Sequence, residues 1–473
     1  MMKLNLIAGI LISCLSLSFK TPGTKESTDP PMNILFITAD DMGMQMGYLN
    51  TPGLETPTLD SLARNGTFFT KTYATFPSCS PSRTSFLTGT YPHVNGVTTN
   101  VHEYVGANPP EGFIKQSAEL NTQFAVNKNV TTLIEVLKKQ GYFTGLTGKF
   151  HISSREKFPF DYWGKDVNAE QFFKEAKKSK KPFFLDYNLH SPHRPYEKSP
   201  RERSKINLDN LDVPPYLPNN ALMQKDWSDY LGAVEATDRS VKELLSHLKR
   251  EGLDKNTLIV FLSDHGPSIH RGKYYAYNFG SHVPLILSGP NITKGRKSKS
   301  LTSLADLMPT VLDLLNIPVP ASVNGKSFKK VLENQDTPIN KYIFTEVSFP
   351  RKGETNYQAR GMTDGRFWYI RRNGKPRMAG KPEDNYEVKN WGNYSFKATL
   401  DGKGEFPLQY RLLQASENLP PREELFDLYS DPWSMHDIIT NEEYKNVLSR
   451  MSMEMDAWIT RTNDKEMLMT VKN

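Results

Sequence analysis

The chain has 473 residues, of which 37% are hydrophobic and 23% are charged. This composition fits a soluble globular protein, and the length exceeds what one small core needs, so we expect one large domain and a smaller one. The net charge of +7 is compatible with an acidic substrate. No basic run is interleaved with aromatic residues, so we expect no nucleic-acid partner.

Residues 1–19 are typical of an export signal. Lys3 supplies the charged end, and the mostly apolar stretch 4–17 is too short to span a membrane. We expect an exported protein without a transmembrane segment, either periplasmic or lipid-anchored at a bacterial envelope. Cys14 ends a stretch that resembles a lipoprotein cleavage box and would carry the lipid; the alternative is an ordinary signal cut a few residues later. Residues 20–31 should form a flexible leader.

Buried-strand and helical patterns alternate from residue 32 to residue 345. The runs that predict strands are 33–38, 68–73, 142–148, 182–189 and 258–263, and the helical patterns are 56–66, 131–140, 226–251 and 304–315. This alternation predicts an α/β domain with a largely parallel sheet. Residues 346–473 instead contain short strands such as 366–372 and a last helix, 442–460, which predict a smaller antiparallel α+β subdomain.

Polar side chains follow the ends of four predicted strands. They are Asp40 and Asp41, Lys149 and His151, His193, and Asp264 and His265, with Lys273 a short way downstream. Open α/β sheets bind ligands at the carboxyl edge of their strands, so these groups are expected to meet there. Two adjacent carboxylates suit a hard cation, although a helix cap or a solvated turn is the alternative for an isolated Asp-Asp pair.

The sequence around Cys79 predicts the N-terminus of a helix. Pro81 suits the first helical position and Gly89 the residue beyond the last one. Free N–H groups and the helix dipole favour an anion there, and Arg83 adds a positive charge one turn later. The alternative is a buried structural cysteine. Because the only other cysteine, Cys14, lies in the export signal, Cys79 remains available for chemistry.

The stretch 79–83, Cys-Ser-Pro-Ser-Arg, followed by Leu-Thr-Gly at 87–89, resembles the signature of type I sulfatases. Further blocks match in order: 38–41, 148–151, 191–193, 263–266, Lys273, 424–428 and 431–432. Nearly the whole mature chain is thus similar to sulfatases of the alkaline phosphatase superfamily. The resemblance implies a large mixed, mostly parallel sheet sandwiched by helices, as a catalytic domain over 32–345.

In these sulfatases a formylglycine-generating enzyme oxidises the signature cysteine, here Cys79, to formylglycine. The resemblance implies that Asp40, Asp41, Asp264, His265 and modified Cys79 ligate one divalent cation, Ca²⁺ in most relatives. His265 stands where many relatives have asparagine. Imidazole is a softer ligand than Ca²⁺ prefers, which leaves Ca²⁺ and Mg²⁺ both open.

The resemblance also implies the roles of the catalytic residues. The set is Cys79, Arg83, Lys149, His151, His193 and Lys273. The hydrate of formylglycine attacks sulfur and is stabilised by the cation and Arg83. Lys149, His193 and Lys273 neutralise the sulfate oxygens, and His193 protonates the leaving group. His151 holds the formylglycine hydroxyl and helps expel sulfate.

Within the family, several stretches resemble heparan N-sulfatases (sulfamidases). They are 183–185, 190–195, 211–218, Trp458 and 462–464, whereas the match departs at 264–272. This resemblance implies a sulfated oligosaccharide substrate, with the N-sulfate of terminal glucosamine in heparin or heparan sulfate as the target. The alternatives are an O-sulfatase on glycosaminoglycans or other host glycans, a phosphatase or phosphodiesterase of the superfamily, and a non-catalytic glycan-binding relative.

Two of these alternatives conflict with particular residues. Phosphatases and phosphodiesterases of the superfamily usually keep a serine or threonine nucleophile and two zinc sites, which Cys79 in its signature argues against. A protein that only binds glycans does not need the full set of Lys149, His151, His193 and Lys273. The sequence therefore favours a sulfatase.

Overall fold

The computed structural model describes residues 31–101, 122–164, 167–196, 206, 211–335, 337–349, 357–374, 393–417 and 420–471. The predicted export signal and nearly all of the predicted leader lie outside these residues. The chain from Met32 onward forms one compact unit. None of the described helices combines the length and the hydropathy that a membrane span requires.

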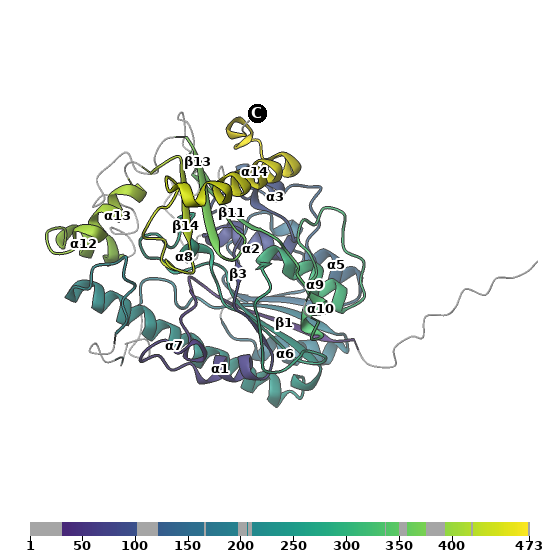
Figure 1. Cartoon of the computed structure of the whole chain (residues 1–473). Coiled ribbons are helices and arrows are strands. Elements are labelled where there is room, and N and C mark those ends of the chain that lie inside the picture. Colours follow the sequence, from purple (N-terminus) through teal and green to yellow (C-terminus); the bar gives the residue numbers. More distant parts are fainter. Residues whose placement is uncertain are drawn as a thin grey trace, which may run out of the picture. The chain divides into compact units, whose positions relative to one another are not determined.

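The larger sheet has eight strands in the order β5-β4-β6-β1-β7-β8-β2-β9 (Figure 1). In that order their bounds are Tyr162–Gly164, Phe143–Gly148, Phe183–Asn188, Asn33–Ala39, Thr257–Ser263, Leu285–Ser288, Thr67–Phe69 and Arg296–Ser298. Only β8 runs antiparallel to its neighbours, β7 and β2. The predicted mixed, mostly parallel sheet is confirmed. A small parallel pair, β3 (Thr72–Tyr73) and β10 (Thr302–Ser303), lies apart from it in the topology.

Helices cover both faces of the larger sheet. The α-helices of this part of the chain are α1 (Pro57–Arg64), α2 (Cys79–Thr88), α3 (Pro92–Asn95), α5 (Leu133–Lys139), α6 (Glu170–Ser179), α7 (Ala221–Arg250), α8 (Asn278–Ser281), α9 (Leu307–Leu314) and α10 (Lys329–Leu332). Because successive side chains of a strand point to opposite faces, Leu35 and Ile37 of β1 pack with α1, α6 and α7. Ile34 and Phe36 pack with α2, α5, α9 and α10 (Figure 1). Burial on both faces explains why β1 is apolar throughout.

The C-terminal part forms an antiparallel sheet in the order β11-β12-β13-β14. Its strands are β11 (Ile343–Phe349), β12 (Tyr357–Thr363), β13 (Phe367–Asn373) and β14 (Glu423–Asp427), and its helices are α12 (Tyr394–Asp401), α13 (Pro407–Glu417) and α14 (Lys445–Thr462). On one face Trp458 of α14 stacks on Phe344 with ring centroids 4.6 Å apart. On the other face Trp368 donates a hydrogen bond of 2.8 Å to the carbonyl oxygen of Ala276. This sheet is thus attached to the segment that follows Lys273, and the predicted antiparallel subdomain is confirmed.

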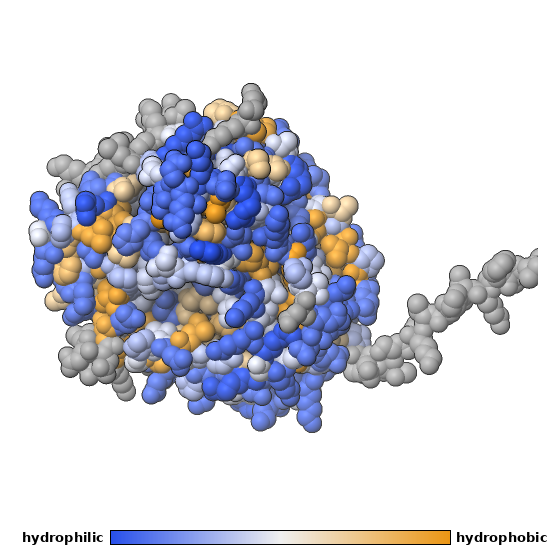
Figure 2. Space-filling model, in the orientation of Figure 1, coloured by the Kyte–Doolittle hydropathy of each residue, from blue (hydrophilic) through white to orange (hydrophobic). Residues whose placement is uncertain are grey.

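The structure differs from the sequence patterns in several local features. The predicted helix 304–315 is divided into a 3₁₀ helix and α9, and α6, α12 and α13 were not predicted. The predicted domain boundary after residue 345 falls inside β11. The short 3₁₀ helices are η1 (Gly47–Leu49), η2 (Arg155–Lys157), η4 (Asp254–Asn256), η5 (Leu304–Asp306), η7 (Glu442–Tyr444) and η8 (Leu468–Thr470). Figure 2 shows that the viewed face is mostly hydrophilic, with small scattered hydrophobic areas.

Candidate active site

Cys79 is the first residue of α2, and its side chain is fully buried. The helix begins two residues before Pro81, so Pro81 takes its third position and not the predicted first one. Proline costs no hydrogen bond at either place, because the first four N–H groups of a helix have no partner within it. Gly89 ends the helix with a left-handed φ of 66°, as predicted. Cys79 therefore lies at the helix end where an anion is stabilised.

Four buried residues place metal-binding atoms around one point. Asp40 and Asp41 directly follow β1, and one ligand atom each from Asp40, Asp41, Cys79 and His265 lie within 4.8 Å of one another. Cys79 Sγ lies 3.6 Å from Asp40 Oδ1 and 3.3 Å from His265 Nε2. His265 Nε2 lies 3.2 Å from Asp41 Oδ1. Carboxylate oxygens and an imidazole that converge in this way fit a divalent cation.

Asp264, also predicted as a metal ligand, lies directly beside this group. Its Oδ1 accepts hydrogen bonds from the backbone N–H groups of Asp41 (3.1 Å) and His265 (2.9 Å). Its Oδ2 accepts from Arg83 Nε at 2.9 Å and lies 2.9 Å from Arg83 Nη2. Asp264 thus connects Arg83 to the four convergent residues. Asp41 has a left-handed φ of 69°, a strained conformation of the kind that clusters at functional sites.

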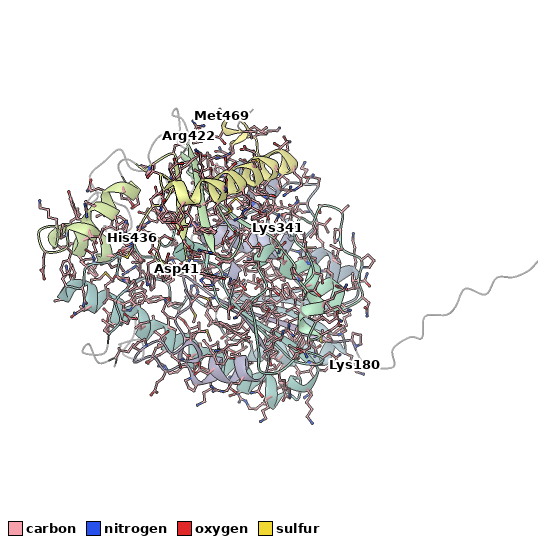
Figure 3. All side chains as sticks on the ribbon, viewed as in Figure 1. Asp41, Lys180, Lys341, Arg422, His436 and Met469 are labelled. Carbon is pink, nitrogen blue, oxygen red and sulfur yellow. The ribbon has the colours of Figure 1, made fainter. Side chains whose placement is uncertain are left out.

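Two lysines bring positive charge to the carboxylates. Lys149, just after β4, lies with Nζ 2.7 Å from Asp40 Oδ2. Lys273 Nζ lies 3.0 Å from Asp41 Oδ1 and 3.2 Å from His193 Nε2. Figure 3 labels Asp41 within the fold, in contrast to Lys180 and Met469 at its periphery. Residues predicted from four separate strand ends therefore meet at one place.

The cations keep the two aspartates ionised. Burial alone would raise the pKa of Asp40, but Lys149 and the neighbouring cations lower this pKa well below its usual value. Burial likewise opposes ionisation of Asp41, and Lys273 is the main group that lowers its pKa. Burial would lower the pKa of Lys149, yet Asp40 raises it. Asp40, Asp41 and Lys149 are therefore charged at neutral pH.

The two histidines of the cluster differ in charge. Burial and the nearby Lys273 lower the pKa of His193 to about 4, so its imidazole is neutral at pH 7. Burial would also lower the pKa of His265, but Asp264, Cys79 and Asp41 raise it to about 9. Because a histidine ligates a metal in its neutral form, binding of a cation at His265 would release a proton.

His151 lies at the border of the cluster. Its Nε2 donates to the carbonyl oxygen of Val101 at 2.7 Å. Burial and then Lys149, whose Nζ lies 3.5 Å from Cys79 Sγ, lower the pKa of His151 well below its usual value. His151 also has a left-handed φ of 49°. The structure thus brings all the predicted site residues into one region, with His151 at its edge.

Sequence patterns missed the residues that hold Arg83 and His193 in place. Arg83 Nη1 donates to Asn188 Oδ1 at 2.6 Å. Asn188 is the last residue of β6, so the strand-end rule could have found it. Arg194, next to His193, pairs with buried Asp226 of α7 at 2.5 Å, and no local pattern indicates that contact.

The fold and the buried charged site belong to a known class of hydrolases. A family model described as "Sulfatase" matches residues 32–317, which is more than half of the chain. The chain therefore belongs to the sulfatase family, as predicted.

Individual relatives cover most of the chain. An ulvan-active sulfatase of Formosa agariphila is 27% identical over 91% of this chain and 75% of its own length. Human N-sulphoglucosamine sulphohydrolase is 26% identical over 92% of this chain and 91% of its own length. A protein solved with its substrate, D-glucosamine-2-N,6-O-disulfate, covers 92% of this chain and 98% of its own, with a TM-score of 0.66 and 20% identity. That last likeness shows the shared fold, which is the alkaline phosphatase-like fold of sulfatases.

Proposed function

We propose that the protein removes sulfate from a glycan, and that its target is the N-sulfate of terminal glucosamine in heparin or heparan sulfate saccharides. The observation that carries the proposal is the meeting of Cys79, at a helix N-terminus, with Lys149, Lys273 and His193. The choice of N-sulfate is supported by a relative, human N-sulphoglucosamine sulphohydrolase, that is similar over nearly its whole length. The reaction converts R–NH–SO₃⁻ and water into R–NH₃⁺ and sulfate.

We propose that Cys79 is oxidised to formylglycine by a formylglycine-generating enzyme. Asp40, Asp41, His265 and the modified residue would hold one divalent cation, Ca²⁺ or Mg²⁺, with Asp264 as a further ligand. When bound, such a cation supplies positive charge that stabilises an oxyanion. Formylglycine supplies a hydrated aldehyde, whose two hydroxyls suit attack on sulfur and later release of sulfate.

The chain's own cations are placed to bind the sulfate group. Lys149 directly follows β4, Lys273 lies in the segment between β7 and α8, and both are held by buried carboxylates. Donors that are fixed before the substrate arrives need no reorganisation as charge develops, and each contributes about 10²–10³ in rate. Arg83, held by Asp264 and Asn188, keeps a positive charge beside the nucleophile.

His193 is the proposed proton donor to the leaving nitrogen. Its Nδ1 donates to the carbonyl oxygen of Arg194 at 2.5 Å, which leaves Nε2 directed at Lys273 and the sulfate position. Burial and Lys273 keep the pKa of His193 low in the free protein. A bound sulfate group brings negative charge next to the ring and raises that pKa, so protonation of His193 accompanies substrate binding.

Sulfate release from matched saccharides tests the proposal. Protein with verified formylglycine is incubated with N-sulfated glucosamine and with O-sulfated N-acetylglucosamine, and released sulfate is quantified. We expect turnover of the N-sulfated sugar, with Cys79→Ala as the inactive control. Activity only on the O-sulfated sugar would contradict the N-sulfate assignment and leave a glycan O-sulfatase.

An O-sulfatase is the second candidate, and one observation favours it. An endo-4-O-sulfatase of Bacteroides thetaiotaomicron is 24% identical over 65% of this chain and 74% of its own length, an identity close to the 26% of the N-sulphoglucosamine enzyme. A phosphatase or phosphodiesterase has less support, because the described residues contain one cluster of convergent metal-binding groups and not two.

We also propose that residues 1–19 direct export to the periplasm or to a lipid anchor at Cys14, which cell fractionation would test.

A further inference from the structure

The cluster around Cys79 is partly exposed at His193 and Lys149, and at His151 on its edge. The exposed fraction of the side chain is 20% for His193 and 15% for Lys149. It is 4% for Lys273, and Cys79 is fully buried. The side on which His193, Lys149 and His151 are exposed, the mouth of the site, is therefore the side from which a substrate would approach Cys79. Residues beside this mouth are placed to contact the part of the substrate that lies beyond the sulfate.

Tyr274 is a half-buried residue directly after Lys273. Its φ of 70° is a left-handed conformation that a bulky residue rarely adopts. Its backbone N–H donates at 2.7 Å to the carbonyl oxygen of Pro77, in the segment that leads into the Cys79 helix. The ammonium group of Lys273 lies 5.6 Å from the centroid of its ring. The backbone thus turns the ring back towards the first turn of α2.

A second connection fixes the other end of the Tyr274 side chain. Asn100 Nδ2 donates to the Tyr274 hydroxyl at 2.8 Å. Asn100 Oδ1 accepts from the backbone N–H of Ser80 at 3.0 Å and from the hydroxyl of Ser78 at 2.6 Å. Asn100 therefore uses both ends of its amide to tie the phenol to the residues on either side of Cys79. A strained backbone and a side-chain bridge together hold this ring rigidly beside the nucleophile position.

We infer that the ring of Tyr274 forms one wall of the mouth and packs against the sugar ring that carries the sulfate. A pyranose presents C–H groups on its faces, and an aromatic side chain offers a large apolar surface at low conformational entropy cost. The adjacent Lys273 binds the sulfate, so sugar and sulfate are contacted by consecutive residues. This inference rests on the proposed function, because its ligand is a sulfated sugar.

Two variants distinguish the contribution of the Tyr274 ring from that of its hydroxyl. Tyr274→Asn removes the ring, and asparagine tolerates the left-handed conformation, so the backbone should persist. Tyr274→Phe keeps the ring and removes the hydroxyl that accepts the bond from Asn100. We expect Tyr274→Asn to raise KM for the N-sulfated saccharide about tenfold, because one aromatic contact with the sugar is lost. The change in kcat should be much smaller. Tyr274→Phe should stay within about threefold of the wild type.

The inhibition constant of inorganic sulfate distinguishes contact with the sugar from a merely structural role. If Tyr274 only supported the structure of the site, its loss would change this constant as well. Sulfate contacts the cations and not the Tyr274 ring, so its inhibition constant should be unchanged in both variants. Three results would overturn the inference: an unchanged KM in Tyr274→Asn, equal losses in both variants, or weakened sulfate inhibition that parallels the rise in KM. If the wild type releases sulfate from no saccharide, the proposed function itself fails. If the wild type is active and Tyr274→Asn has the same KM, only the role of Tyr274 fails.

Discussion

The protein contains two clusters of mostly buried ionisable groups, and they are built differently. The strand-end cluster contains Asp40, Asp41, Cys79, Arg83, Lys149, His193, Asp264, His265 and Lys273. The C-terminal cluster contains His93, Glu346, Arg360, Asp464 and Glu466 and joins α3 to β11, β12 and the end of α14. Most side chains of both clusters are buried, with Glu466, His193 and Lys149 partly exposed, so burial of charge does not by itself distinguish the clusters.

In the C-terminal cluster each cation is matched to a carboxylate. Arg360 pairs with both oxygens of Asp464 at 2.7 and 3.0 Å and contacts Glu466 at 3.2 Å. His93 Nδ1 pairs with Glu346 at 2.6 Å. Two-pronged pairing of this kind fixes the relative geometry of the paired groups. We infer that this cluster stabilises the attachment of the C-terminal sheet.

In the strand-end cluster the groups converge on a point. Ligand atoms of Asp40, Asp41, Cys79 and His265 all lie within 4.8 Å of one another, and lysines provide the neutralising charge. Lysine ammonium groups are compact charges that can interact with a carboxylate and a bound anion together. Convergence of metal-binding atoms beside a nucleophile, and not exposure to solvent, distinguishes the strand-end cluster from the C-terminal one.

The largest expected effect is the loss of the nucleophile. Cys79→Ala should lower sulfate release by at least about 1,000-fold, because no other group at that place provides covalent catalysis. The thermal unfolding midpoint should change little, since the variant differs from the modified wild type only in the aldehyde group of one side chain. Retained turnover in this variant, measured against a wild type with verified formylglycine, would refute the proposed mechanism.

Arg360→Met tests whether the C-terminal cluster acts in stability and not in catalysis. Removing one partner leaves Asp464 buried and unpaired, which should lower the free energy of unfolding by about 3–5 kcal/mol. Sulfate release per folded molecule should not change. The double variant Arg360→Met/Asp464→Leu is the matched control and should regain much of the stability in a denaturant titration. A large drop in turnover of the folded protein would place the C-terminal cluster in the site.

Lys273→Met tests whether the strand-end cluster acts in catalysis. Loss of a fixed donor to the sulfate should lower kcat/KM by about 10²–10³. Lys273→Arg should recover part of this loss, because it keeps the charge and changes its geometry. Initial rates over a range of saccharide concentrations measure the effect. A variant that loses stability but keeps kcat/KM would show that Lys273 only pairs with Asp41.

The smallest expected effect is a pH dependence at His93. Burial would lower the pKa of His93, but the charge and hydrogen bond of Glu346 raise it. His93 therefore contributes stability that is fully present below the unfolded-state pKa of about 6.5 and is lost as the pH rises through the folded-state pKa. Relative to His93→Gln, the wild type should gain about 1 kcal/mol at pH 5.5 and less at pH 9, measured by urea unfolding. A difference that does not vary with pH would contradict a charged His93.

Sequence patterns predicted those parts of the fold in which the local residue pattern and the tertiary packing favour the same structure. The continuous apolar run of β1 and the polar residues after it located Asp40 and Asp41, because buried parallel strands share one functional edge. The antiparallel direction of β8 could not be predicted, because it depends on pairing with β7 and β2. Tyr274 was missed for a similar reason, since its bond to Asn100 joins residues 174 positions apart.

The mass of the peptide that contains Cys79 tests the central claim most directly. The full-length protein is isolated from its native host, treated with a thiol-alkylating reagent and with a carbonyl-reactive hydrazide, and digested. The account predicts that position 79 carries an aldehyde, which reacts with the hydrazide and not with the alkylating reagent. An unmodified thiol at Cys79 in protein that releases sulfate would contradict it.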